Sequence, residues 1–375
     1  MVFTRCRLLL ILLLVMAAGA AATSAQTELG GAHDAGIDWT QRLLASQNQA
    51  IDQVVASAAS PDAQLRANAM EASAHLPAAR ALPLLHLGFT DQVVPVRFAA
   101  LVTAGRQRFR QLVPSARQVA ADPGQNPHVR AAALFALSGC GQRVDMTPLA
   151  AMLESPEPSL RGNAAMLLGL AGNRSAIPML SVLGRQALPA TVSPVRGVIV
   201  RIQVAEALVR LGDESGLSMI RGGLYSSYDE VRVLAAAMIG RLCDDRMEEA
   251  LFGIIDDKRE STIELRLAAI EALARLERNL IVVKETLDRA DLAVSVANGG
   301  APALRAQAAQ ALGALERARQ RGLASLHGLQ STPPQNIGQR FEQTGTAAAL
   351  LQLLADESEQ VRLAAAAAIL EPRGS

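Results

Sequence analysis

Residues 129–137 read VRAAALFAL, and the same arrangement returns as VRVLAAAMI at residues 231–239 and as VRLAAAAAI at residues 361–369. Each copy has Val or Leu, then Arg, then usually Ala three residues after the Arg, with small and aliphatic residues following. The nine copies are marked by Arg66, Arg97, Arg130, Arg161, Arg201, Arg232, Arg266, Arg305 and Arg362. Neighbouring arginines are 31, 33, 31, 40, 31, 34, 39 and 57 residues apart. Periods of this length are typical of repeat proteins.

A second apolar run lies between consecutive copies and often begins with Pro, as at Pro83, Pro148 and Pro178. Pro is tolerated in a first helical turn because its missing N–H would be unpaired there. Ala and Leu dominate the chain and aromatic residues make up only 3% of it, which favours helices over strands. Each unit therefore predicts helix A, a short turn and helix B, with helix B near the Val-Arg pair. Stacked units predict an all-α solenoid of about nine two-helix repeats that forms a right-handed superhelix.

The units resemble HEAT repeats, particularly the short bacterial variety that also occurs in phycobilisome lyases. The copies cover residues 60–371, and an N-terminal helix near Trp39 extends the expected solenoid to 39–371. The resemblance implies an armadillo-like helical fold in which B helices line the concave, partner-binding surface. The longer spacings depart from the pattern and predict insertions near 184–198, 279–300 and 330–344.

Helical phase separates the two faces of helix B, at 100° per residue. Counting from the Arg, positions −1, +3, +7 and +10 form the predicted core face, and position +3 is Ala in every copy except at Val204. Positions +2, +5 and +9 lie opposite and are expected to be exposed. The candidate binding residues on that face are Gln203, Glu206, Arg210, Arg241, Glu271 and Arg275. Stacking would place the three arginines in a row, although Glu206–Arg210 and Glu271–Arg275 could also be plain i,i+4 surface pairs.

The repeated Arg of each copy is interpreted as a structural ladder. Acidic residues precede several copies, as Asp62 precedes Arg66, and an Arg near a helix start can bond a carboxylate and the turn carbonyls. Cys140 and Cys243 end B helices three repeats apart, about 30 Å at 8–10 Å per helix. A disulfide between them is excluded at that distance, so we expect two buried thiols.

The first 25 residues have the layout of a secretory signal peptide. Arg5 and Arg7 precede an apolar run, residues 8–18, and small residues follow. We expect cleavage between Ala20 and Gln26, a flexible linker over 26–38, and a mature protein that is periplasmic or secreted from a bacterium. The apolar run is short for a membrane span, although an uncleaved anchor remains the alternative.

The sequence carries no motif for chemistry. It has no HExxH, paired CxxC, phosphate loop or GxSxG, and its five histidines lack metal spacing. We therefore expect no catalytic or metal-binding residue and no cofactor. With 36 basic and 35 acidic residues, the chain has no general attraction for nucleic acid. The arginine runs are interpreted as solvated helix ends: Arg106, Arg108, Arg110, Arg317, Arg319 and Arg321.

The predicted function is an exported, non-enzymatic scaffold that binds another protein or peptide on its concave surface. The resemblance implies an alternative, a lyase-like enzyme or enzyme subunit, although phycobilisome lyases act on cytoplasmic proteins. A structural component of the envelope is a third possibility.

Overall fold

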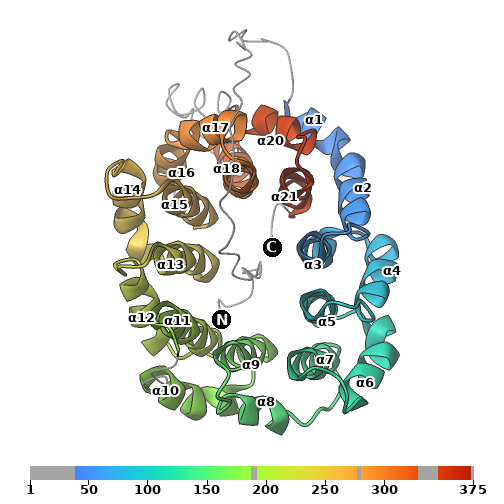
Figure 1. Cartoon of the computed structure of the whole chain (residues 1–375). Coiled ribbons are helices and arrows are strands. Elements are labelled where there is room, and N and C mark those ends of the chain that lie inside the picture. Colours follow the sequence, from blue (N-terminus) through green and yellow to red (C-terminus); the bar gives the residue numbers. More distant parts are fainter. Residues whose placement is uncertain (1–38, 187–191, 277–279, 328–344, 373–375) are drawn as a thin grey trace.

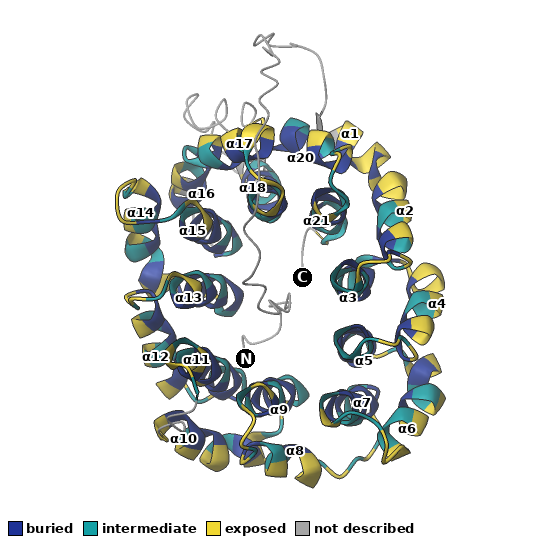
Figure 2. Ribbon diagram, viewed as in Figure 1, coloured by how far each residue is buried: buried dark blue, intermediate teal, exposed yellow. Residues whose placement is uncertain are grey.

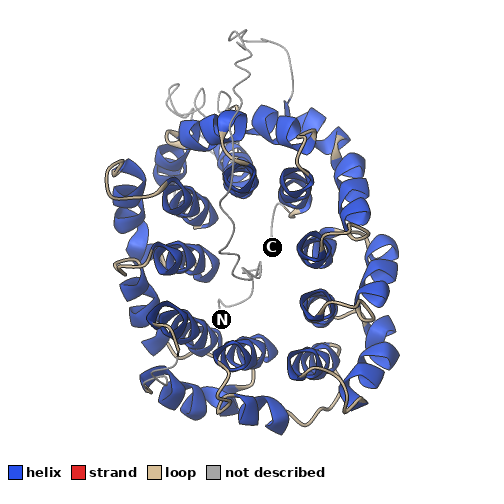
Figure 3. Ribbon diagram, in the orientation of Figure 1, coloured by secondary structure: helices blue, strands red, loops and turns tan. Residues whose placement is uncertain are grey.

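The computed structural model describes residues 39–186, 192–276, 280–327 and 345–372, and these residues contain helices and no strand (Figure 3). Two layers of helices form a ring, with helix A of each repeat outside and helix B inside (Figure 1). The outer helices are α1 (Trp39–Ala45), α2 (Gln47–Ser57), α4 (Ala78–Gly88), α6 (Val113–Ala121), α8 (Thr147–Met152), α10 (Ile177–Arg185), α12 (Ser215–Gly223), α14 (Glu248–Asp256), α16 (Leu280–Leu287), α17 (Ala290–Gly299) and α20 (Thr346–Leu354). The inner helices are α3 (Ala63–Ala72), α5 (Val94–Gln107), α7 (Pro127–Gly139), α9 (Pro158–Ala171), α11 (Pro194–Arg210), α13 (Asp229–Leu242), α15 (Ile263–Arg275), α18 (Pro302–His327) and α21 (Glu359–Leu370). Four 3-10 turns join some of them: η1 (Ser73–His75), η2 (Arg110–Leu112), η3 (Arg174–Ala176) and η4 (Asp245–Met247).

The repeated arginines hold the turns between helices A and B. Arg66 Nη1 donates to the carbonyls of Ser60 and Pro61, at 2.9 and 3.1 Å, and its Nε donates to Asp91 of the next repeat at 2.8 Å. At the other end of the chain, Arg362 Nη1 donates to two turn carbonyls in the same way. The structural interpretation is confirmed for these two copies and for the copies that make similar contacts with carbonyls at the turn or at the end of helix A, at Arg97, Arg161, Arg232, Arg266 and Arg305. Arg201 is exposed instead.

Small residues set the distance between inner helices. The side chains at position +3 are fully buried in all nine copies. Position +8 is Gly in alternate copies, and it faces the Ala at position +6 of the next inner helix. A Cβ added at Gly240 would lie 2.6 Å from the Cα of Ala272, and one added at Gly105 would lie 2.8 Å from the Cα of Ala136. Because backbones touch at these points, the inner helices pack as closely as helices can.

The two ends of the array meet and close the ring. Helix α21 packs against α2 and α3, and α1 packs against α20. Leu43 and Val54 belong to the same continuous apolar core as Leu350 and Val361 (Figure 2). Two hydrogen bonds also cross the seam, Arg362 Nε to Gln53 Oε1 at 3.1 Å and Ser60 Oγ to Glu359 Oε2 at 3.2 Å. The predicted paired-helix solenoid is confirmed, whereas its closure was not predicted; the helix expected as an N-terminal cap contacts the last repeat.

The expected insertions differ in nature. The stretch 279–300 contains the extra helix α16 followed by α17, so it is largely helical. The stretch 184–198 ends in one additional turn at the start of α11, and residues 187–191 within it lie outside the described residues, as do residues 330–344. Neither Cys140 nor Cys243 is in a disulfide. Cys140 occupies the core position +10 and is buried as expected, but Cys243 is exposed because it lies at position +11, one residue beyond that core position.

Candidate binding surface

The predicted row at position +9 is not exposed. Arg241 is only 6% exposed, and the side chains of Arg210 and Arg275 are 14% and 15% exposed. Glu206 is 4% exposed. The expectation of a solvated row was wrong because the neighbouring inner helices approach closely enough to cover these positions from both sides.

Glu206 is shared between two inner helices. Its carboxylate accepts from Arg210 Nη2 of the same helix at 2.8 Å and lies 3.6 Å from Arg241 Nε on α13. Burial alone would raise the pKa of Glu206, but Arg241 and Arg210 outweigh burial and hold the pKa below its usual range. The i,i+4 contact of Glu206 with Arg210 is present, but it is buried and not the plain surface pair that was expected. Arg241 extends the pair across the α11–α13 junction.

A second network joins the seventh repeat to the last. Arg275 donates to Glu271 at 3.0 Å and to Glu371 at 2.9 Å, and Glu371 also lies 2.7 Å from Arg317 Nη2. Burial would raise the pKa of Glu371, yet Arg317 and Arg275 lower it to about 2. For Arg317, burial is the largest influence and lowers the pKa to about 10. Glu371 is therefore ionised and is held between two guanidinium groups.

In these networks the charged residues of the predicted site bind one another or other residues of the chain. Gln203 lies apart from the charges, packed against Gly162 of the preceding inner helix. Removing one partner of a buried ion pair typically costs about 3–5 kcal/mol because the other charge stays buried alone. The structure thus gives Arg210, Arg241, Glu271 and Arg275 a stabilising role.

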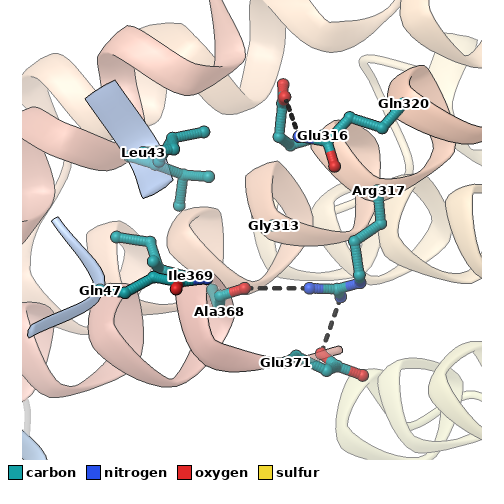
Figure 4. A pocket seen from close by; sticks show the side chains of 10 residues that line it. Leu43, Gln47, Gly313, Glu316, Arg317, Gln320, Ala368, Ile369 and Glu371 are labelled. Atoms are coloured by element: carbon teal, nitrogen blue, oxygen red, sulfur yellow. Dashed lines mark hydrogen bonds and ion pairs between the residues drawn. The ribbon is translucent and has the colours of Figure 1, made fainter. Parts of the chain in front are cut away.

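A pocket at the ring seam belongs to the same network (Figure 4). It holds about 360 Å³ of empty space, part of it open to solvent, between Leu43 of α1, the middle of α18 and the end of α21. Its charged lining groups are already bonded: Arg317 donates to the Ala368 carbonyl at 3.0 Å, and Glu316 accepts from Gln320 at 2.7 Å. The pocket is therefore part of the closure of the ring.

A different set of arginines is exposed at the rim where B helices lead into the next A helix. Position +13 is Arg110, Arg143 and Arg174 in three consecutive repeats, and Arg108 lies beside the first. All four are exposed, and within the described residues none is in an ion pair. We call these four residues the arginine rim.

Contacts between repeats show that the rim is continuous. Burial raises the pKa of the Cys140 thiol at the end of α7, and Arg110 of the preceding repeat is close enough to oppose that rise. Arg117 of α6 donates to Gln142, next to Arg143, at 3.0 Å. A Cβ added at Gly212, in the following repeat, would lie 3.8 Å from the Arg174 guanidinium. The rim therefore crosses three adjacent repeats, from α5 to α11.

The backbone at Arg108 is strained. Five B helices end with a left-handed residue at position +11, and three of these residues are glycines: Gly141, Gly172 and Gly212. The other two are Arg108, with φ 56°, and Cys243, with φ 54°. A left-handed conformation costs a non-glycine residue about 1–2 kcal/mol. Such strain concentrates at functional positions, and here it accompanies a side chain that contacts solvent.

Sequence reasoning missed the rim because it stopped at the end of helix B. The same register, continued four positions past the predicted row, gives Arg at +13 in copies two to four and Glu214 and Asp245 in copies five and six. That change of sign was the available signal. Arg108 and Arg110 were interpreted as solvated helix ends, and their exposure is confirmed. The same interpretation is wrong for Arg317 and Arg319, which are 8% and 7% exposed because they lie inside α18, against the last repeat.

The described residues hold no group of three or more His, Cys, Asp or Glu side chains placed to bind a metal ion. In the same part of the chain, no helix has the length and apolar character that crossing a membrane requires.

No family model matches the chain. No curated protein is similar to it. Solved structures share its fold at low identity. The complex of CpcE and CpcF of phycocyanin lyase from Nostoc sp. PCC7120 is 17% identical, with a TM-score of 0.41 over 73% of this chain and 98% of that one. Human deoxyhypusine hydroxylase is 17% identical, with a TM-score of 0.34 over 74% of this chain and 97% of the enzyme.

Kap121p bound to Nup53p is 12% identical, with a TM-score of 0.40 over 87% of this chain. The match covers 42% of Kap121p, so this chain spans less than half of that protein's length. With TM-scores below 0.5, these likenesses carry no further conclusion. The chain's own helices show an all-α solenoid of paired, HEAT-like repeats.

Proposed function

We propose that the protein is exported and acts as a non-enzymatic scaffold that binds another protein through the arginine rim. The supporting observation is the contrast in arginine use. The inner arginines are buried against carboxylates, whereas Arg110, Arg143 and Arg174 are exposed and have no ion pair within the described residues. Charges that the fold does not use internally are available to a partner.

Ring closure supports the same proposal. A surface that spans several repeats of an open solenoid changes shape when the solenoid bends, but the continuous core across the seam restricts such bending. Because binding then requires little ordering of the surface, a preorganised rim loses less free energy on association. Export rests on the N-terminal sequence, with Arg5, Arg7 and the apolar run after them.

The test is capture from the native cell envelope with tagged full-length protein. The comparison variant reverses the rim through Arg110→Glu, Arg143→Glu and Arg174→Glu. We expect intact mass to show cleavage after Ala20 and before Gln26, and a protein partner to be retained by the wild type and lost by the variant. Because the three side chains are exposed, the melting temperature should be unchanged.

Equal retention by both proteins would contradict the rim assignment. A full-length chain that stays in the cytosol would contradict export. A covalent change in the captured partner after incubation with the purified protein would contradict the non-enzymatic assignment.

A further inference from the structure

The spacing of the rim specifies the chemistry of its partner, on the premise that the proposed function holds. We propose that the arginine rim binds an extended acidic segment of the partner protein, with carboxylates at every third residue. The inference uses the register of Arg110, Arg143 and Arg174, which occupy the same position in consecutive repeats.

Repeat spacing matches an extended peptide. Neighbouring packed helices lie about 8–10 Å apart, so equivalent guanidinium groups have about that spacing. A chain in the extended polyproline II conformation has three residues per turn and advances about 3.1 Å per residue, or roughly 9 Å for three residues, so residues i, i+3 and i+6 lie on one face. Glu or Asp at i, i+3 and i+6 would therefore meet Arg110, Arg143 and Arg174 in turn. Each guanidinium presents the planar fork that a carboxylate can accept in two parallel hydrogen bonds.

The chain sets both ends of this footprint. Position +13 is Ala79 in the repeat before Arg110, and it is Glu214 and Asp245 in the two repeats after Arg174. An acidic segment would be repelled past Arg174, so it is limited to three repeats. The acidic residue within the footprint, Asp145, accepts the backbone N–H of Thr147 at 2.9 Å and so caps the start of α8.

The surroundings of the rim favour an acidic protein over a membrane or a nucleic acid. Most exposed large apolar side chains of the described residues lie on helices outside the rim: Leu44, Leu87, Tyr225, Ile263 and Ile281. Met179 and Val182 are the exceptions among them, on the outer helix α10 that follows Arg174. A membrane surface would be expected to find apolar residues beside the basic ones. Phe109, the aromatic residue between Arg108 and Arg110, is half-buried against the apolar core, so it offers no face on which a base could stack.

The experiment compares two labelled peptides of identical composition with the full-length protein. One has Glu at positions i, i+3 and i+6, separated by Gly and Ser, and the other has its three Glu residues adjacent. We expect the spaced peptide to bind about fivefold to tenfold more tightly at low salt, with the difference shrinking at high salt. Arg143→Glu, at the centre of the rim, should remove the preference.

The matched control is Arg246→Glu, which reverses an exposed arginine outside the rim at position +14 of the sixth copy. It should leave both affinities unchanged, and thermal melting should show that both variants fold. Equal binding of the two peptides would overturn the proposed register, because net charge alone would then explain recognition.

Two other outcomes would also overturn the inference. One is the absence of binding by either peptide while the captured partner still requires the rim; the proposed function would then stand without an acidic segment. The other is tighter rim-dependent binding of anionic phospholipid vesicles or of a single-stranded oligonucleotide than of the spaced peptide. Failure of the proposed function itself is seen separately, as equal capture by the wild type and the reversed rim.

Discussion

Two arcs of the ring use arginine in opposite ways. Residues 94–152, from the start of α5 to the end of α8, contain seven arginines and two aspartates. Residues 205–290 contain 17 acidic and 12 basic residues. In the second arc Arg210, Arg241 and Arg275 are buried against carboxylates, whereas in the first arc Arg110 and Arg143 are exposed.

The difference lies in the charges, because the packing of the two arcs is the same. Both bring a Gly at position +8 against an Ala at position +6, as in Gly105 with Ala136 and Gly240 with Ala272. The compared arginines also differ in register: Arg210, Arg241 and Arg275 lie at position +9, where Glu206 and Glu271 pair with them, whereas Arg110 and Arg143 lie at position +13, beyond the end of helix B. One arc uses its arginines in internal ion pairs, and in the other they are exposed, where we propose that a partner binds.

The largest expected effect comes from breaking the ion-pair network that joins Arg275 of the second arc to Glu371 in the last repeat. Glu371→Gln removes the carboxylate held between Arg275 and Arg317 and leaves two buried guanidinium groups together. We expect the free energy of unfolding to fall by about 3–5 kcal/mol, measured by chemical denaturation. The control is Glu357→Gln in the same repeat, whose side chain is 89% exposed and which should have almost no effect. Equal effects of the two variants would mean that the ion pairs of Glu371 do not stabilise the ring.

Low pH provides a second way to weaken the ion pairs of Glu371. The pKa of Glu371 is about 2 in the folded protein, below its ordinary value of 4.5, because Arg317 and Arg275 outweigh the effect of burial. A carboxyl whose pKa is lowered by folding stabilises the protein above its unfolded pKa and loses this contribution as pH falls. The melting temperature should therefore drop between about pH 4.5 and pH 2, and the drop should be smaller in Glu371→Gln. Parallel curves for the two proteins would assign the acid sensitivity to other groups.

Packing shared by the two arcs predicts equal effects at equivalent glycines. Gly240→Ala and Gly105→Ala each place a Cβ within 3 Å of a neighbouring backbone atom. Each should cost about 1–3 kcal/mol of stability through overpacking. Gly253→Ala in α14, where a Cβ meets nothing within 4 Å, should instead stabilise the helix by up to about 1 kcal/mol. A large difference between the first two variants would mean that the arcs differ in packing as well as in charge.

The sequence predicted what local periodicity controls. The arginine ladder at the turns and the buried position +3, including Ala235, follow from register within one repeat, and both are confirmed, the ladder in most of the copies. Closure of the ring follows from a small rotation per repeat summed over nine repeats, which no single copy encodes. The burial of Arg241 could not be predicted because helical phase describes one helix, whereas its cover comes from two neighbours. Cys243 was expected to be buried because its place at position +11, one residue beyond the core position, was not recognised.

The variant with the smallest expected effect on stability distinguishes the two arcs most clearly. Arg108→Gly removes a rim charge and also relieves a left-handed backbone, at φ 56°. The relief of about 1–2 kcal/mol is offset in part by the greater freedom of Gly in the unfolded chain, about 0.5–1 kcal/mol, so the net gain is about 0–1.5 kcal/mol. Because Arg108 is exposed, its loss leaves no cavity. Stability should therefore rise slightly while affinity for an acidic partner falls.

Cys243→Gly is the matched control, because Cys243 occupies the same position +11 in the second arc, residues 205–290, and has φ 54°. It should give the same small rise in melting temperature and no change in affinity, since it removes no rim charge. If both glycine variants raise the melting temperature and only Arg108→Gly weakens binding, the arginine is kept at position 108 at a cost to stability because the partner requires it. If neither variant changes affinity, Arg108 is not part of the binding surface, and the rim reduces to Arg110, Arg143 and Arg174.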